Sequence, residues 1–358
     1  MAKKRVVVVG AGIIGASLAF HLAVQGAEVI VIDRLARAGG VATPHSWAWI
    51  NASWGNPMPY FKLRHRSMAL WHALERQVAG LRVNWCGGLL WDLPPAELAA
   101  YAATQAAWGY GARHVTRTEI QRLEPELVDP PELGVHVAEE GAIEPVYAVQ
   151  CLAQAAQALG ATFQNETRLQ HLVCDAGVVT GVATDAGVIS ADEVVLAAGA
   201  ATPELLASLG IKFRLDTPAG MLVHSEPTAP MLKGLVMAPE VHVRQTAEGR
   251  LVAGSDFGGA QPGDDADAAA QALFKKVQAM FKSGDSLKFG FYTIGYRPTP
   301  PDGVPAVGRI AGFEGLYVIA THSGVTLAPA LGAFGATEIM GGERQELLQP
   351  FSPQRLMS

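Results

Sequence analysis

The alternation of hydrophobic and polar positions is most informative in the first 33 residues. Residues 6–9 are four consecutive valines, a run that predicts a strand buried on both faces. Residues 13–24 have the length and apolar spacing of a helix, and residues 28–32 predict a second strand. The chain therefore opens with a predicted β-α-β unit.

The rest of the chain alternates between helical and strand-rich stretches. Residues 34–59, with glycines at 39 and 40 and prolines at 44, 57 and 59, predict a long loop. We expect helices at residues 60–78, 95–108, 150–159, 266–281 and 327–340. We expect strands at residues 87–93, 194–198, 251–253, 289–294 and 317–320, and two more near residues 172 and 182.

Composition excludes several classes of protein. The 358 residues carry 33 acidic and 27 basic side chains, a net charge of −6 without a basic block, which argues against a nucleic-acid partner. The three cysteines, Cys86, Cys151 and Cys174, form no C-x-x-C pair, so we expect neither a disulfide framework nor a metal site. A reduced, cytoplasmic setting is the expectation that follows.

The N-terminus is similar to a targeting segment, because Lys3, Lys4 and Arg5 precede an uncharged run over residues 6–27. Four glycines interrupt this run, and it also contains His21 and Gln25. It continues without a cleavage-site pattern into another apolar stretch. We therefore expect neither export nor a transmembrane span.

The sharpest motif is Gly10-Ala-Gly12-Ile-Ile-Gly15, which lies between the first strand and the first helix. In a dinucleotide-binding unit, Gly10 permits the tight turn, Gly12 lets the backbone approach a pyrophosphate, and Gly15 allows the helix to pack closely on the strand. The helix N-terminus, with Ile13 and Ile14 in its first turn, would then face the phosphates. A glycine-rich turn without a ligand is the alternative interpretation.

The second strand ends at Asp33, 18 residues after the last glycine of the motif. A carboxylate there accepts hydrogen bonds from an adenosine ribose and repels a 2′-phosphate. Arg34, the next residue, weakens that exclusion of a phosphorylated ribose. The motif by itself does not distinguish NAD from FAD.

Three further segments favour FAD over NAD. The loop of residues 39–46 offers small or hydroxyl-bearing residues to an extended pyrophosphate and ribityl chain, together with a histidine: Gly40, Thr43, His45 and Ser46. The strand of residues 191–198 ends in small residues, Ala198 and Gly199, as needed beside the adenine half. Residues 315–324 again lead from a strand into glycine and a helix.

The chain resembles the FAD-dependent amino acid and amine oxidoreductases of the D-amino acid oxidase, glycine oxidase and sarcosine oxidase group. The similar segments are GAGIIG with Asp33, VVLAAGA, GYRPTPPDGVPAVG and GLYVIATHSGVTLAPALG, so the resemblance covers essentially the whole length. We expect an α/β fold in which a Rossmann-type FAD-binding domain is interleaved with a mostly antiparallel β-sheet substrate domain. The FAD-binding domain would comprise residues 1–80, 146–215 and 300–358, and the substrate domain residues 81–145 and 216–299.

The resemblance also implies roles for individual residues toward FAD. The ADP part would be bound by Gly10, Gly12, Gly15 and Asp33, with Leu169 and Gly199 beside the adenine. A helix N-terminus would meet the pyrimidine end of the flavin, where the reduced form is negative, through Ser323, Gly324, Val325 and Thr326.

For the substrate, Arg297 matches the family's carboxylate-binding arginine, and a structural ion pair is the alternative. His242 lies where some members place a pocket tyrosine, and its functional and structural interpretations stay open. Trp49, together with Trp47 and Asn51, either lines the flavin face or belongs to the core.

Covalent attachment of FAD is not expected. Some members of this family attach FAD through a late cysteine, but no cysteine follows Cys174. Others use an early histidine, and His45 lies in that region with flanking residues that match poorly. We therefore expect non-covalent FAD.

The expected activity is FAD-dependent oxidation of an amino or imino acid, with a hydride passing from the carbon bearing the amine to flavin N5 and the imine then hydrolysing. The electron acceptor would be O2 or another molecule. Two alternatives remain: an NAD-dependent dehydrogenase, and a flavin-binding subunit of a hetero-oligomeric amine dehydrogenase. The choice of amine, oxidase against dehydrogenase, and a homo-oligomeric or hetero-oligomeric state also stay open.

Overall fold

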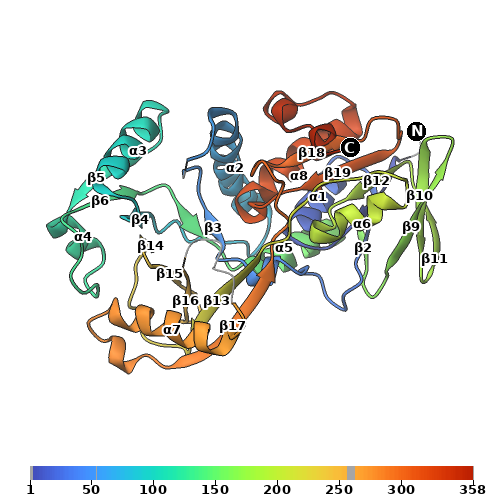
Figure 1. Ribbon diagram of the computed structural model, residues 1–358. Coiled ribbons are helices and arrows are strands. Elements are labelled where there is room, and N and C mark those ends of the chain that lie inside the picture. Colours follow the sequence, from blue (N-terminus) through green and yellow to red (C-terminus); the bar gives the residue numbers. More distant parts are fainter. Residues whose placement is uncertain (1–2, 54, 256–262, 358) are drawn as a thin grey trace.

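The computed structural model describes residues 3–53, 55–255 and 263–357, and most of its strands belong to two sheets (Figure 1). The first sheet brings together strands from the start, middle and end of the chain. Its order is β18 (Ala306–Arg309), β19 (Leu316–Ala320), β12 (Glu193–Leu196), β1 (Arg5–Val9), β2 (Glu28–Ile32) and β8 (Thr162–Gln164). All neighbours are parallel except β18 and β19.

The second sheet has eight strands and is antiparallel except where β14 meets β4. Its order is β17 (Phe289–Tyr296), β13 (Ala219–Ser225), β16 (Leu251–Gly254), β15 (Val241–Gln245), β14 (Leu235–Ala238), β4 (Gly88–Leu90), β6 (Leu133–Val137) and β5 (Ala112–Thr116). Two small sheets complete the strands: β9 (Leu169–Asp175), β10 (Val178–Thr184) and β11 (Gly187–Ser190), and the pair β3 (Trp49–Ile50) and β7 (Gly141–Ala142).

The helices divide between the two main sheets. Beside the six-stranded sheet lie α1 (Ile13–Val24), α2 (Met58–Gln77), α5 (Pro145–Ala158), α6 (Thr202–Ala207) and α8 (Gly324–Gly341). Beside the eight-stranded sheet lie α3 (Pro95–Ala107), α4 (Arg117–Leu123) and α7 (Ala266–Ala279). Short 3-10 turns lie at Thr43–His45, Gly199–Ala201, Gly284–Ser286, Glu346–Phe351 and Pro353–Leu356.

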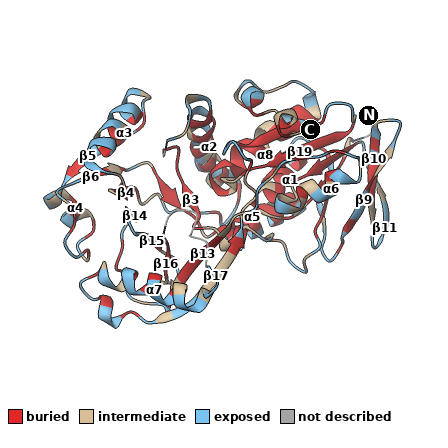
Figure 2. Cartoon of the chain, in the orientation of Figure 1, coloured by how far each residue is buried: buried red, intermediate tan, exposed pale blue. Residues whose placement is uncertain are grey.

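Burial explains why the first unit was easy to predict. The four valines of β1 are all buried, because β2 and β12 flank the strand and other elements cover both faces of the sheet (Figure 2). Helix α1 is apolar on nearly every side because it packs against α5 and α8. None of the described helices combines the length and apolar character needed to cross a bilayer.

Several predicted elements differ in extent. Helix α5 begins at Pro145, five residues before the predicted start, because proline suits the first turn of a helix. Helix α8 begins at Gly324 rather than at 327, and the strand expected at 87–93 is only Gly88–Leu90. The loop of residues 34–59 contains a 3-10 turn and the short strand β3.

Each strand of the two main sheets falls within the residue segments expected for its domain. We propose that these sheets mark the two interleaved domains. The expected boundary at residue 146 falls inside α5, so residue 145 is the better start for that segment.

Candidate active site

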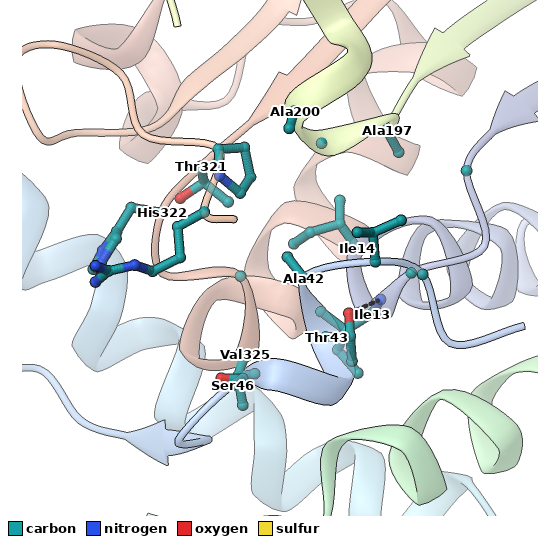
Figure 3. A pocket seen from close by; sticks show the side chains of 18 of the residues that line it. Ile13, Ile14, Ala42, Thr43, Ser46, Ala197, Ala200, Thr321, His322 and Val325 are labelled. Carbon is teal, nitrogen blue, oxygen red and sulfur yellow. Dashed lines mark hydrogen bonds between the residues drawn. The ribbon is translucent and has the colours of Figure 1, made fainter. Parts of the chain in front are cut away.

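A cavity of about 580 Å³ lies at the carboxyl edge of the six-stranded sheet. Its wall includes residues that directly follow four of the strands: Gly10 after β1, Asp33 after β2, Ala197 after β12 and Thr321 after β19. Ligands of open α/β sheets bind at this edge. Figure 3 shows Ile13, Ile14, Ala42 and Thr43 on one side and Thr321 and His322 on another.

The three glycines of the Gly10–Gly15 motif differ in whether a side chain would fit at their position. A Cβ on Gly10 (φ +108°) would lie 2.5 Å from the Ala197 carbonyl oxygen, and one on Gly15 would lie 1.9 Å from the Gly10 carbonyl oxygen. The fold itself therefore requires these two glycines. A Cβ on Gly12 (φ −73°) would lie 3.5 Å from Thr43 Oγ1, an ordinary contact, so the protein alone would accept a side chain there.

Gly12 thus leaves a space in the cavity wall that the protein itself does not fill. This open cradle fits the pyrophosphate-bearing cofactor expected from the sequence. Gly40 (φ +68°) lies over it, because a Cβ there would be 2.9 Å from Gly12 Cα. Thr43 Oγ1 accepts a hydrogen bond from the Ile13 N–H at 3.3 Å, which ties the loop to the start of α1 (Figure 3).

Asp33 joins the end of β2 to the glycine turn. Its carboxylate is 9% exposed and accepts hydrogen bonds from the N–H groups of Ala11 (2.7 Å) and Leu35 (2.8 Å). Because a carboxylate has about four acceptor sites, it retains capacity for hydroxyl groups of a ligand in the cavity. Arg34 and Leu169 also line the cavity.

The wall formed by residues 45–51 is held by the eight-stranded sheet. Trp47 Nε1 donates to the Val252 carbonyl oxygen at 3.1 Å, and Arg244 Nε donates to the Trp47 carbonyl oxygen at 2.6 Å. Ala48 adopts a left-handed conformation (φ +62°), a sparsely populated state for a non-glycine residue. Trp47 and Trp49 are both buried and both line the cavity, so they serve the core and the wall together.

Four arginines line the cavity: Arg34, Arg64, Arg168 and Arg297. Arg297 follows β17, and its Nη1 lies 3.5 Å from His322 Nε2. Arg64 of α2 is only 6% exposed, and its guanidinium donates to the Asn51 carbonyl oxygen (3.1 Å) and to Ser323 Oγ (2.6 Å). No ion pair joins Arg64 to a carboxylate within the described part of the chain. The cavity therefore has a positive wall.

His322 connects Arg297 to Arg64 through hydrogen bonds by way of Ser323. An arginine only donates, so His322 Nε2 is the acceptor and the ring proton is assigned to Nδ1. Nδ1 lies 3.2 Å from Ser323 Oγ, the residue that also accepts from Arg64. The neutral form of His322 suits this position between two guanidinium groups.

The structure brings nearly all of the predicted site residues to one cavity. From the cofactor set these are Gly10, Gly12, Ile13, Ile14, Asp33, Arg34, Gly40, Thr43, His45, Ser46, Leu169, Ala198, Gly199, Ser323, Gly324, Val325 and Thr326. Arg297, Trp47, Trp49 and Asn51 also line it. Gly15 lies beneath the cavity wall and supports it through its packing on Gly10.

His242 is placed differently from the prediction. It is 3% exposed, it does not line the cavity, and its Nε2 lies 2.9 Å from the buried Asp92 carboxylate. Its ring centroid is 6.0 Å from that of Trp47, on which it packs. The pocket position assigned to His242 is therefore corrected to a buried supporting position, because β15 carries the side chain into the interior.

His45 lies in the cavity wall next to β17, where a Cβ on Gly295 would be 2.5 Å from its own Cβ. Burial lowers the pKa of His45, which favours the neutral ring.

Two important residues escaped sequence reasoning. Arg64 lies on the buried face of α2, four residues after Tyr60, and a charged residue on an otherwise apolar helix face was a usable signal. Glu140 is fully buried and accepts hydrogen bonds from Trp49, Ser53 and Tyr110. Burial raises the pKa of Glu140 to about 7. Nothing in its local sequence marks this position.

Comparison with known proteins gives matches along nearly the whole chain. A family model described as FAD dependent oxidoreductase matches residues 5–336. A glycine oxidase from Pseudomonas putida is 28% identical over 373 residues, covering 98% of each chain. A D-amino acid dehydrogenase from Methylobacterium nodulans is 27% identical over 408 residues, covering 94% of this chain and 95% of that one.

Solved structures match equally broadly. The L-proline dehydrogenase from P. horikoshii has a TM-score of 0.88 at 24% identity and covers 99% of this chain and 97% of its own. The glycine oxidase from Geobacillus kaustophilus has a TM-score of 0.88 at 23% identity and covers 99% of both chains. These similarities confirm the expected α/β fold.

Proposed function

The chain belongs to the FAD-dependent oxidoreductases, and from this membership we propose that it oxidises the carbon–nitrogen bond of an amino or imino acid. The observation that carries the proposal is Arg297, whose guanidinium lines the same cavity as the open cradle at Gly12. The relatives named glycine oxidase and D-amino acid dehydrogenase support an amino acid as substrate. Family membership also sets aside the NAD-dependent alternative.

The residues around the cradle are those we assign to the cofactor. The N-terminus of α1 and Gly12 would hold the pyrophosphate, Asp33 the ribose hydroxyls, and the N-terminus of α8 at Gly324 the pyrimidine end. When bound, FAD supplies the acceptor for a hydride from the carbon that bears the amine.

The chain's own residues orient the substrate and select for a substrate that carries a carboxylate. Arg297 offers a planar fork for a carboxylate, and His322 accepts a hydrogen bond from that fork at 3.5 Å. The positive charges of Arg297 and Arg64 disfavour an ammonium group in the cavity, so the substrate amine binds in its neutral form. The buried indoles of Trp47 and Trp49 exclude water from the same wall.

The substrate class is tested by an anaerobic stopped-flow screen. Bleaching of the flavin absorbance is followed with amino acids, N-methyl amino acids and cyclic imino acids, and reoxidation by O2 then separates oxidase from dehydrogenase. We expect bleaching by at least one of these acids. No bleaching by any of them would favour a subunit that needs a partner chain.

Acid precipitation should release the yellow colour into the supernatant, because His45 is not expected to carry a covalent bond.

The role of Arg297 is tested with Arg297→Ala and Arg297→Lys. Each variant is compared with the wild type on the best acid and on its decarboxylated amine. Loss of the charged hydrogen bonds should cost about 2–5 kcal/mol in kcat/KM for the acid, and lysine should recover only part because it lacks the planar fork. FAD content should stay normal. Undiminished preference for the acid in Arg297→Ala would remove this residue from the substrate site.

A further inference from the structure

Glu140 lies between β6 and β7, behind the cavity wall, with no exposed surface. Its Oε1 accepts hydrogen bonds from Ser53 Oγ at 2.6 Å and from the Tyr110 hydroxyl at 2.7 Å. Its Oε2 accepts from Trp49 Nε1 at 2.9 Å. Trp49 and Ser53 line the cavity. The Glu140 carboxylate therefore accepts hydrogen bonds from two residues of the cavity wall.

The chemistry of the donors explains why a carboxylate stands here. An indole N–H can only donate, and a carboxylate is a side chain with acceptors alone. A glutamine of the same size would direct its NH2 group either at the Trp49 N–H, which cannot accept, or at the Ser53 and Tyr110 hydroxyls, which would have to turn from donors into acceptors. A Cβ on Gly88 would lie 2.4 Å from Glu140 Oε2, so the backbone of β4 also confines the carboxylate.

The hydrogen bonds continue from Glu140 to the buried cation. Ser53 Oγ accepts from Asn51 Nδ2 at 3.2 Å, Asn51 Oδ1 accepts from Arg64 Nη2, and Arg64 Nη1 donates to Ser323 Oγ at 2.6 Å. A buried carboxylate and a buried guanidinium are thus connected through two neutral side chains. The charge of Arg64 partly offsets the effect of burial on the pKa of Glu140.

We propose that Glu140 is the positioning residue of this cavity wall: it fixes the Trp49 indole and, through Ser53 and Asn51, the guanidinium of Arg64. The effect of Glu140 on turnover rests on the proposed function, because this effect requires that the substrate occupies this cavity. A wall displaced by an ångström is enough to slow a reaction that depends on alignment by about 100-fold.

The test uses Glu140→Gln in the FAD-loaded protein, with Glu338→Gln as the matched control. Glu338 is also buried and also accepts from a tyrosine, the Tyr317 hydroxyl at 2.7 Å, but it does not line the cavity. Glu140→Gln should lower the rate of flavin reduction about 10- to 100-fold with normal FAD content. Glu338→Gln should lower the thermal unfolding midpoint and leave the reduction rate unchanged. An equal loss of rate in both variants would overturn the proposal.

A spectroscopic readout separates this proposal from the proposed function. The emission of Trp49 in the FAD-free protein is obtained as the difference between each protein and its Trp49→Phe counterpart. Glu140→Gln should shift this difference spectrum, whatever the substrate is. The double variant Glu140→Gln/Trp49→Phe should be no slower than the slower single variant, because both changes act on the same wall. An unchanged Trp49 spectrum, or fully additive losses of rate, would contradict the proposal.

Ser53→Ala carries the test if Glu140→Gln does not fold. This change removes the Ser53 hydroxyl, which hydrogen-bonds both Glu140 and Asn51 and so connects Glu140 to Arg64. The hydrogen bond between Trp49 and Glu140 stays in place. The reduction rate should fall while the Trp49 emission stays as in the wild type. A wild-type reduction rate in Ser53→Ala would overturn the proposed connection.

Discussion

At Gly10 and Gly15 an added methyl group would collide with the protein's own backbone, and at Gly12 it would not. The same sequence motif therefore contains two kinds of glycine. Gly10 and Gly15 close the turn and bring α1 onto the strand. Gly12 leaves a space open in the cavity wall, and we assign that space to the proposed cofactor.

This difference predicts separate effects for Gly12→Val and Gly15→Ala. Gly12→Val should purify without flavin while its FAD-free form unfolds at nearly the wild-type temperature. Gly15→Ala should lower the free energy of unfolding by about 1–3 kcal/mol, the usual cost of overpacking, because its Cβ would lie 1.9 Å from a carbonyl oxygen. The flavin-to-protein absorbance ratio and thermal unfolding of the FAD-free proteins measure both. Full flavin content in Gly12→Val would place the cofactor elsewhere.

The predictability of single residues depends on whether their role is local. The glycines and Asp33 were predicted because a strand–turn–helix motif fixes their spacing along the chain. The family and FAD were confirmed, whereas the roles of individual residues, Arg297 included, stay predictions. Glu140 and Arg64 are connected only in the folded chain, through Ser53 and Asn51. Nothing in the local sequence marked Glu140, and the charge of Arg64 on the apolar face of α2 was the one local signal. The sequence left the position of His242 open, and the structure places it outside the cavity wall, beside Asp92.

At the scale of elements, α1 and α8 approach each other closely through small residues. A Cβ on Gly332 of α8 would lie 2.4 Å from Ser17 Oγ and 2.9 Å from His21 Cδ2 on α1. Ser17 Oγ also donates to the Ala328 carbonyl oxygen at 2.7 Å. The two helices are therefore held at a separation that allows no side chain at Gly332, and both begin at the cavity.

Gly332→Ala should therefore destabilise the protein, with Gly341→Ala as the control in the same helix. Overpacking at Gly332 should lower the free energy of unfolding by about 1–3 kcal/mol. A Cβ on Gly341 meets no heavy atom of the described residues within 4 Å, so alanine there should be neutral or slightly stabilising. Denaturant unfolding of the FAD-free proteins measures the two effects. Equal stabilities would mean that α1 and α8 can separate without cost.

Element boundaries were predicted well where the signal was local. Helix α1 and strand β2 have the predicted bounds, because an apolar run and flanking glycines define them. Strands β5, β6, β13, β14 and β15 of the second sheet were not predicted individually. Strand β14 pairs with β4, about 150 residues earlier in the chain, whereas β5 and β6 pair with each other about 20 residues apart. The mostly antiparallel second sheet was predicted only from the strand-rich character of its segments.

At the scale of the molecule, buried titratable groups in both halves contribute to the dependence of stability on pH. Burial lowers the pKa of His21 on α1 to about 4. Burial, and then the charges of Arg244 and Arg250, lower the pKa of His224 on β13 to about 4. Burial raises the pKa of Glu140 to about 7. The first two groups resist protonation in the folded state, and the third resists ionisation.

These shifts predict a net loss of stability on acidification from pH 7 to pH 4. Each histidine takes its proton near 6.5 when unfolded and near 4 when folded, so the unfolded state binds more protons in between. This costs about 3 kcal/mol for each of His21 and His224. Glu140 acts in the opposite sense by about 3 kcal/mol between pH 7 and 4.5, because its folded form takes the proton first. Denaturant unfolding at several pH values measures the free energy of unfolding. His21→Leu should make its decrease on acidification smaller, and Glu140→Gln should make that decrease larger. A free energy of unfolding that rises on acidification would contradict this balance.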